Sequence, residues 1–293
     1  MLHHPLSMLT EAARVGLPTA CAGCGRWDVT LCEDCAALLT APPHRVEHAD
    51  AAAGLPVWAL AAYTGPVRSL VLRWKNGLRE DLGAVMSTAG ERAGRWLSDC
   101  LSAEVLAAAS DATLLVIPAP SGLRRRLSGR LVAAELADAV ARGLAAAWSD
   151  AHPAAVHKPA VVASADVLRR RLGAGAAHQA GRSAAQRRAN RSVPPRLMAS
   201  VRGQSVLLVD DVVTTGATLG ACARALTGAG AVVGGALVVA ATPPPSRARP
   251  PQLPGGPSPS LTEVGRNNHR GRSMWRRYPP RCGAADVAAQ EMV

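Results

Sequence analysis

Short apolar runs alternate along the middle of the chain with longer segments in which apolar residues recur every three or four positions. Runs of the first kind are typical of buried β-strands, and segments of the second kind are typical of amphipathic helices. Because the predicted strands are apolar on both faces, we expect a parallel sheet covered by helices on each side, with ligands at the carboxyl ends of the strands. The pattern therefore predicts an α/β fold. Strands are predicted at 57–63, 113–117, 159–163, 205–210 and 231–240, and helices at 66–74, 82–97, 131–144 and 217–227.

Three regions of different composition divide the chain. Residues 1–48 hold paired cysteines, residues 49–242 carry the predicted strands and helices, and residues 243–293 are rich in Pro, Gly and Arg. The last region begins with consecutive prolines and shows no apolar periodicity. Pro and Gly at this density do not sustain a packed core. We therefore predict a small cysteine module, one larger domain and a disordered tail.

The charge of the chain is strongly positive. Its 293 residues carry a formal net charge of +12 at pH 7, from 33 Lys and Arg against 21 Asp and Glu. An excess of this size favours nucleic acids or anionic ligands as partners. Part of the excess falls in the predicted tail, so the main domain is only moderately basic. With no Phe and only two Tyr, the core must be built from Ala, Val and Leu.

No segment is long and apolar enough for a membrane helix, which needs about 18 apolar residues. The longest apolar run, at 229–241, contains three glycines. The N-terminal residues also lack the long apolar stretch of a secretory signal. We therefore expect a soluble protein of the cytoplasm with no membrane span, where cysteines stay reduced.

A pair of acidic residues stands at the exit of the predicted strand at 205–210, and a threonine-rich turn follows. Buried carboxylates without partners are costly, so the acids are expected to face a polar ligand. Threonine hydroxyls, a glycine and the N–H groups of a helix N-terminus together form an anion cradle. Acids beside such a cradle suit a sugar phosphate, since carboxylates accept hydrogen bonds from ribose hydroxyls. The motif consists of Asp210, Asp211, Thr214, Thr215, Gly216, Ala217 and Thr218.

This stretch resembles the motif with which type I phosphoribosyltransferases bind 5-phosphoribosyl 1-pyrophosphate (PRPP). The resemblance implies that Asp210 and Asp211 hold the ribose 2- and 3-hydroxyls and serve catalysis. It also implies that residues 214–218 hold the 5-phosphate, and that Mg²⁺ arrives on the pyrophosphate of PRPP. A Walker A loop does not fit, because no lysine follows Gly216. A strand and capped helix of purely structural role would leave the two acids unexplained.

Four cysteines near the N-terminus form two CxxC pairs: Cys21 with Cys24, and Cys32 with Cys35. Each pair can chelate from a tight turn, and four thiolates complete a tetrahedral Zn²⁺ site. Such a closed site leaves no position for a substrate, so the zinc would be structural and would stabilise a region too small to fold alone. A disulfide pair and fortuitously buried cysteines are the alternatives.

The order of these features, a four-cysteine module followed by the acidic motif, resembles the layout of the ComF (competence protein F) family. Segments at 63–77, 117–127 and 178–190 are also similar to this family, so the resemblance extends over roughly 15–242. It implies a type I phosphoribosyltransferase fold, with a flavodoxin-like parallel sheet, and a link to DNA uptake in natural competence.

The resemblance implies that two loops contact the pyrophosphate group of PRPP. The family usually has RGFNQ after its proline-containing strand, whereas this chain has SGRLV at 128–132. Arg124 and Arg130 still supply positive charge there, or else form a solvated helix start. Arg187 and Asn190 lie in a segment rich in Gly, Ala, Ser and Arg, which either closes over the pyrophosphate as a lid or forms a solvated turn.

Two functions follow. The first is binding of Mg-PRPP with transfer of its ribose 5-phosphate to a nitrogen acceptor, a glycosyltransferase reaction. The second is a non-catalytic adaptor of the transformation machinery, with single-stranded DNA or competence proteins as partners. Its arginine loops and basic tail would contact phosphates, although aromatic stacking platforms are scarce. Lys75 would either reach a phosphate or lie on the surface with its charge in water.

Overall fold

The computed structural model describes residues 19–109, 113–121, 131–150, 159, 161–171 and 193–244. The described residues as far as Pro243 belong to one compact unit. The predicted tail from residue 245 onward lies outside the described residues, as do Arg124, Arg130, Arg187 and Asn190, the residues expected to contact pyrophosphate.

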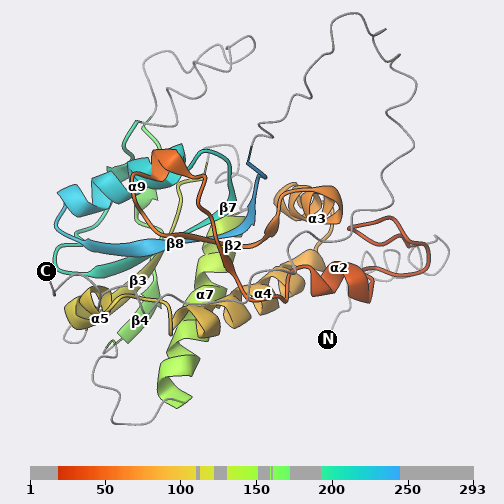
Figure 1. Ribbon diagram of the computed structural model, residues 1–293, viewed down its shortest axis with the longest axis horizontal. Helices are drawn as coiled ribbons and strands as arrows, with labels where there is room; N and C mark the ends of the chain where they lie inside the picture. The colour runs from red at the N-terminus through yellow and green to blue at the C-terminus, as the bar shows by residue number, and fades with distance from the viewer. Residues whose placement is uncertain are drawn as a thin grey trace, which may run out of the picture. The chain divides into compact units, whose positions relative to one another are not determined.

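A six-stranded sheet forms the centre of the fold (Figure 1), in the order β1-β2-β8-β7-β3-β4. All neighbouring strands run parallel except β1, which pairs antiparallel with β2. The predicted α/β fold with a mainly parallel sheet is therefore confirmed. The strands are β1 His44–Arg45, β2 Val57–Ala62, β3 Thr113–Pro118, β4 Val161–Ser164, β7 Ser205–Val213 and β8 Val232–Ala241.

Helices cover both faces of the sheet, as the strand pattern predicted. On β7, Leu207 and Val209 pack against one set of helices, whereas Val206 and Leu208 pack against the other, because successive side chains of a strand point to opposite faces. Figure 1 shows α9 on one side of the sheet and α4, α5 and α7 on the other. The first face carries α3 Gly65–Lys75, α4 Leu82–Leu97, α5 Ala103–Ala109 and α7 Val132–Asp150, and the second carries α9 Ala217–Gly228 and the short 3-10 helix η1 Asp50–Ala52.

The strand that carries the acidic motif is longer than its apolar pattern predicted. It stays paired with β8 as far as Val213, which faces Ala241. Asp210, the last residue of the predicted strand, and Asp211 therefore both lie on β7, near its carboxyl end. The alternation of the strand then sends their side chains to opposite faces of the sheet.

Several short elements had no signature that sequence periodicity could detect. Strands of two residues, such as β1, are too short to show an alternation. The alanine-rich sequence of α5, AEVLAAA, shows no distinct polar face. The remaining unpredicted elements among the described residues are η1, α2 Glu33–Ala37 and the antiparallel pair β5 Leu168–Arg169 and β6 Arg196–Leu197.

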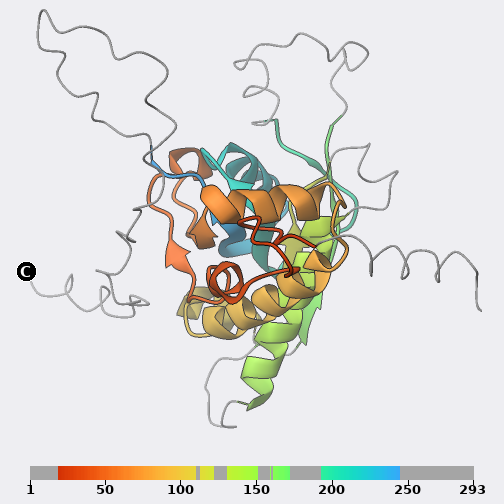
Figure 2. The same ribbon diagram turned by 90° about the vertical axis from the view of Figure 1, so that its right-hand side faces the viewer.

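The segment before β2 contacts both sides of the sheet. Its cysteine-containing part packs into the same core as α3 and α4 (Figure 2), where Cys35 and Leu39 lie in one cluster with Val67 and Leu70. Further along, η1 packs on α9, and His48 Nε2 lies 2.5 Å from the carbonyl oxygen of Thr242 after β8. Among the described helices, none combines the length and the apolar character that a membrane crossing requires.

Candidate functional site

The acidic pair lies at the carboxyl edge of the sheet, where parallel α/β folds place their ligands. Asp211 is buried, with 6% of its surface exposed, and Asp210 is half-buried. The Asp210 carboxylate accepts a hydrogen bond of 2.8 Å from the backbone N–H of Asp211. The two acids are therefore held in fixed positions relative to each other before any ligand binds.

Lys75, the last residue of α3, forms an ion pair with Asp211. The exposed fractions of the two side chains are 21% and 9%, so the contact is largely shielded from water. A buried carboxylate without a partner would be strongly unfavourable, and the ammonium group offsets that cost. The two sequence-based interpretations of Lys75 were a phosphate ligand and a surface residue, and the structure shows it bound to the acid.

Asp210 has an unusual proton affinity. Burial raises its pKa to about 7, and the neighbouring charge of Asp211 adds to this effect. The N–H of Asp211 and the charges of Lys75 and Arg170 act in the opposite direction and reduce the shift. Asp210 therefore exchanges its proton near neutral pH, which is the range in which a carboxyl group can act in proton transfer.

Arg170, which directly follows β5, joins the site, and the sequence analysis did not identify it. Its Nε donates a hydrogen bond of 2.9 Å to the carbonyl oxygen of Pro120, just after β3. Its charge lowers the pKa of both Asp210 and Cys222, although burial dominates in each case and raises the pKa of Cys222 to about 12. Arg170 stands within a run of three arginines at 169–171, so sequence alone gave no reason to single it out.

The threonine-rich turn runs directly from β7 into the N-terminus of α9. Thr214 and Thr215 are exposed, and Ala217 and Thr218 are half-buried. The N–H of Ala217, the first residue of α9, donates a hydrogen bond of 3.4 Å to Thr215 Oγ1. The first N–H groups of a helix have no partners within the helix, which makes a helix N-terminus a suitable place for an anion. The structure thus brings every residue of the predicted motif to one edge of the sheet, within the part of the chain it describes.

The turn requires a glycine at position 216 for two reasons. Its φ of +80° is a conformation that other residues rarely adopt. A Cβ atom there would also lie 2.9 Å from the carbonyl oxygen of Ala49 and from the backbone nitrogen of Ala52, which belong to the η1 segment. The N–H of Ala51 donates a hydrogen bond of 3.0 Å to the carbonyl oxygen of Thr215, so η1 holds the turn from outside.

The four cysteines of the N-terminal segment converge on one point. Their sulfur atoms all lie within 4.8 Å of one another, and Cys32 Sγ is 3.7 Å from the sulfurs of both Cys21 and Cys24. Four sulfurs at about 2.3 Å from a central Zn²⁺ would be separated by roughly 3.8 Å. The geometry therefore fits a tetrahedral metal site. Cys21, Cys24, Cys32 and Cys35 are all free thiols, so the alternative of a disulfide within this set does not hold.

The backbone around Cys21 favours its thiolate, whereas burial raises the pKa of Cys35. Burial by itself would raise the pKa of Cys21, but N–H groups of Cys32, Cys24 and Gly23 outweigh it and lower this pKa to about 6. Gly23 is required by close packing, because a Cβ atom there would lie 2.7 Å from Cys35 Sγ. A thiolate is the form that binds a metal ion.

Arg79 ties the cysteine segment to the turn between α3 and α4. Its guanidinium donates to the carbonyl oxygens of Ala20 and Thr30, at 3.0 and 2.9 Å, and is held in place by Asp81. Charge-assisted hydrogen bonds of this kind are stronger than those between neutral groups. The cysteine cluster is therefore anchored to the helix that ends in Lys75.

The residues expected to contact pyrophosphate, Arg124, Arg130, Arg187 and Asn190, lie outside the described residues. A search of curated proteins found no match for this chain. Residues 132–251 match the family model of the phosphoribosyl transferase domain. The matched region begins at the first residue of α7 and includes the acidic pair, the threonine turn, α9 and β8. Together with the parallel sheet and the acids at its carboxyl edge, this match identifies a phosphoribosyl transferase domain in the chain.

Proposed function

We propose that the chain binds Mg-PRPP and transfers its ribose 5-phosphate to a nitrogen acceptor. Asp210 and Asp211 would accept hydrogen bonds from the ribose hydroxyls, and residues 214–218 would hold the 5-phosphate. The observation that carries this proposal is the juxtaposition of two carboxylates on β7 with the N-terminus of α9. Carboxylates and helix N–H groups side by side match a ligand that presents hydroxyls and a phosphate together.

In the proposed reaction the bond between C1 of the ribose and the pyrophosphate oxygen breaks, and a bond from C1 to the acceptor nitrogen forms. Pyrophosphate leaves with the bonding electron pair, and the nitrogen loses its proton to water. When bound, Mg²⁺ neutralises part of the charge on the leaving group. The residues of the chain contribute positioning of the ribose and positive charge at the edge of the sheet. Among the described cations, Lys75 and Arg170 both act on Asp210. Arg124, Arg130, Arg187 and Asn190 are proposed to contact the pyrophosphate.

We further infer that the chain is a ComF-type protein with a structural Zn²⁺ in its four-cysteine cluster. The support is the combination of that cluster with the acidic motif in one chain, and the sulfur separations that suit zinc. Free thiols at these positions suit a reducing compartment, and a cytoplasmic location is proposed on that ground. A role in DNA uptake is proposed from the resemblance alone.

An adaptor that binds single-stranded DNA or competence proteins is the second candidate function. One structural observation favours it: Trp27, in the cysteine segment, is 68% exposed. An exposed indole provides a surface on which a nucleobase can stack, at about 1–3 kcal/mol for each base. Its neighbour Arg26 is an exposed cation, although it pairs with Asp34 at 3.0 Å.

Release of pyrophosphate from Mg-PRPP in the presence of a broad panel of nitrogen bases tests the transferase directly. We expect release with at least one base, and its loss in Asp210→Asn and Asp211→Asn. Failure of every base would exclude the transferase.

Binding of a labelled oligothymidylate at low salt tests the adaptor. We expect binding that weakens with salt and in Trp27→Ala but survives the two aspartate substitutions. No binding at low salt would exclude the DNA adaptor.

A further inference from the structure

Two acids at the carboxyl edge of the sheet, next to a phosphate cradle, form a typical setting for a magnesium ion. Mg²⁺ in proteins is usually bound through one or two carboxylates together with the phosphates of a substrate. In this chain a cation from the protein already lies there, because Lys75 Nζ forms an ion pair with Asp211 Oδ2. The place at which a metal ion would meet Asp211 is therefore taken by an ammonium group.

The charges of this edge balance one another. The positive charge of Lys75 acts on Asp210 as well as on Asp211, and the charge of Arg170 also acts on Asp210. Two cations therefore stand against two acids. A divalent cation is attracted to an excess of negative charge, and these four side chains together supply none.

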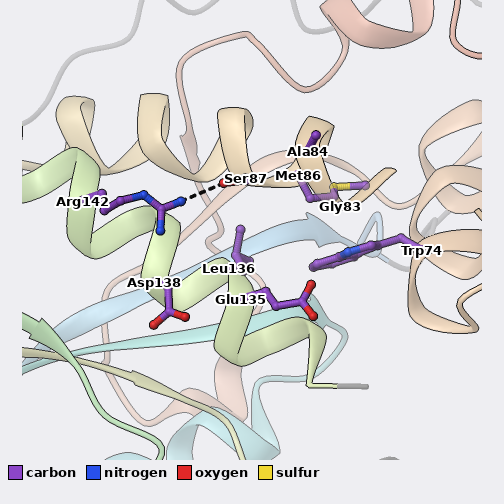
Figure 3. Close-up of a pocket in the computed structure, with 9 residues that line it drawn as sticks. All are labelled: Trp74, Gly83, Ala84, Met86, Ser87, Glu135, Leu136, Asp138 and Arg142. Carbon is purple, nitrogen blue, oxygen red and sulfur yellow. Dashed lines mark hydrogen bonds between the residues drawn. The ribbon is translucent and has the colours of Figure 1, made fainter. Parts of the chain in front are cut away.

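The position of Lys75 is fixed by the packing of the end of α3. Trp74, the residue before it, has 5% of its surface exposed. Figure 3 shows the Trp74 indole extending from α3 toward Met86 of α4 and Leu136 of α7. On the other side of Lys75, Arg79 donates hydrogen bonds to two carbonyl oxygens of the cysteine segment. The ammonium group is thus carried by a helix end that is anchored on both sides.

Lys75 approaches Asp211 from the layer of helices. Val209 packs in the same cluster as Val71 and Trp74 of α3, and alternate residues of a strand point to the same face, so Asp211 also points toward α3. The exposed fractions of the Lys75 and Asp211 side chains are 21% and 9%. Water screens such a contact only weakly, so the charge of Lys75 acts more strongly on Asp211 than it would on the open surface.

We propose that the Lys75 ammonium takes the place of a divalent cation at the acid pair, so that the ribose phosphate part of PRPP binds without Mg²⁺. The inference rests on the proposed function and deepens it, because it leaves Mg²⁺ to the pyrophosphate group. A phosphate and two carboxylates repel one another, and Lys75 reduces this repulsion from a fixed position. Asp211 still accepts a hydrogen bond from a ribose hydroxyl, since a carboxylate has about four lone-pair sites.

Ribose 5-phosphate is the probe for this proposal, because it has the hydroxyls and the 5-phosphate of PRPP but no pyrophosphate. Calorimetric titration of the full zinc-loaded chain should give affinities with and without added Mg²⁺ that differ by less than about twofold. Mg-PRPP is titrated in parallel, which shows whether the chain binds its proposed substrate.

Lys75→Met removes the ammonium group and keeps an unbranched side chain. Without Mg²⁺ this variant should bind ribose 5-phosphate about tenfold more weakly, because the phosphate then meets an unbalanced carboxylate. Added Mg²⁺ should restore most of the lost affinity, since the ion can enter the place of the ammonium. Arg68→Met removes an exposed cation from the same helix and is the matched control, which should bind as the wild type does.

Mn²⁺ gives a readout that does not involve the sugar phosphate, because it takes the same oxygen ligands as Mg²⁺. Electron paramagnetic resonance during a titration with Mn²⁺ separates the free from the bound ion. Lys75→Met should bind one Mn²⁺ more than the wild type, and Lys75→Met combined with Asp211→Asn should not. This difference would assign the additional ion to the carboxylate that Lys75 occupies.

A wild-type chain that binds Mg-PRPP but requires Mg²⁺ for ribose 5-phosphate would overturn the inference and leave the proposed function intact. A chain that binds neither ligand would refute the proposed function, and the inference with it. A loss of affinity in Lys75→Met that Mg²⁺ does not restore, or an unchanged number of bound Mn²⁺ ions, would also overturn the inference. Circular dichroism shows whether Lys75→Met is folded, and the wild-type titrations decide the inference if it is not.

Discussion

Lys75 at the end of α3 is paired with Asp211 on β7, so one acid of the motif is neutralised by a residue from a distant part of the chain. Asp210, one position earlier, has its pKa raised to about 7, first by burial and then by the charge of Asp211. Asp210 is therefore present in both its protonated and its ionised form near neutral pH.

Removal of the ammonium group should destabilise the fold. In Lys75→Met the buried Asp211 loses an ion-pair partner, and we expect the free energy of unfolding to fall by about 2 kcal/mol in urea denaturation. The control is Arg68→Met, which removes an exposed cation from the same helix and should change stability by less than about 0.5 kcal/mol. Equal effects of the two substitutions would show that the ion pair contributes nothing specific.

The raised pKa of Asp210 predicts a pH-dependent stability. Because the folded state holds this proton more tightly than the unfolded state, the contribution of Asp210 is present below pH 3.8 and is lost as pH rises to about 7. Asp210→Asn removes this dependence, so the variant should be more stable than the wild type at pH 8, on the order of 2 kcal/mol, and similar at pH 4. Thermal unfolding of both proteins across this range measures the difference. A constant difference between them would contradict the raised pKa.

Gly216 should not tolerate a side chain. Gly216→Ala forces a residue with a Cβ into a φ of +80° and against η1, and we expect a loss of about 2 kcal/mol with weaker phosphate binding. Gly228→Ala is the matched control at the other end of α9, where a Cβ meets nothing within 4 Å. Chemical denaturation of both variants should separate them, and a neutral Gly216→Ala would refute the account of the turn.

The cysteine cluster should contain zinc that stabilises the fold. We expect about one Zn²⁺ for each purified chain by mass spectrometry, and a lower Tm after chelation. Cys32→Ser should lose the metal, because Cys32 Sγ lies 3.7 Å from two of the other sulfurs. Cys222→Ala, at a buried thiol outside the cluster, should keep it. A metal-free chain with an unchanged Tm would mean that the cluster does not need an ion.

Periodicity predicted the long elements well, since each of the predicted strands and helices overlaps one in the structure. Spacing in sequence also predicted the cysteine cluster and the position of the acidic motif. The partners of that motif were not predictable, because Lys75 at the end of α3 and Arg170 after β5 are far in sequence from Asp211 and Asp210 and come near them only in the folded chain. The sequence also could not predict that the buried N–H of Trp74 has no hydrogen-bond partner among the described residues. A helical pattern shows that a tryptophan is buried, but not which groups surround its ring nitrogen.

Calorimetric titration of the full chain with PRPP, in the presence and absence of Mg²⁺, tests the central proposal most directly. The proposal predicts that the wild type binds Mg-PRPP, and that Asp210→Asn with Asp211→Asn weakens the binding about tenfold or more. It also predicts proton release on binding below about pH 7, because the ribose hydroxyls favour the ionised form of Asp210. Absence of binding to the folded wild type, or equal affinity in the doubly substituted protein, would contradict the proposal.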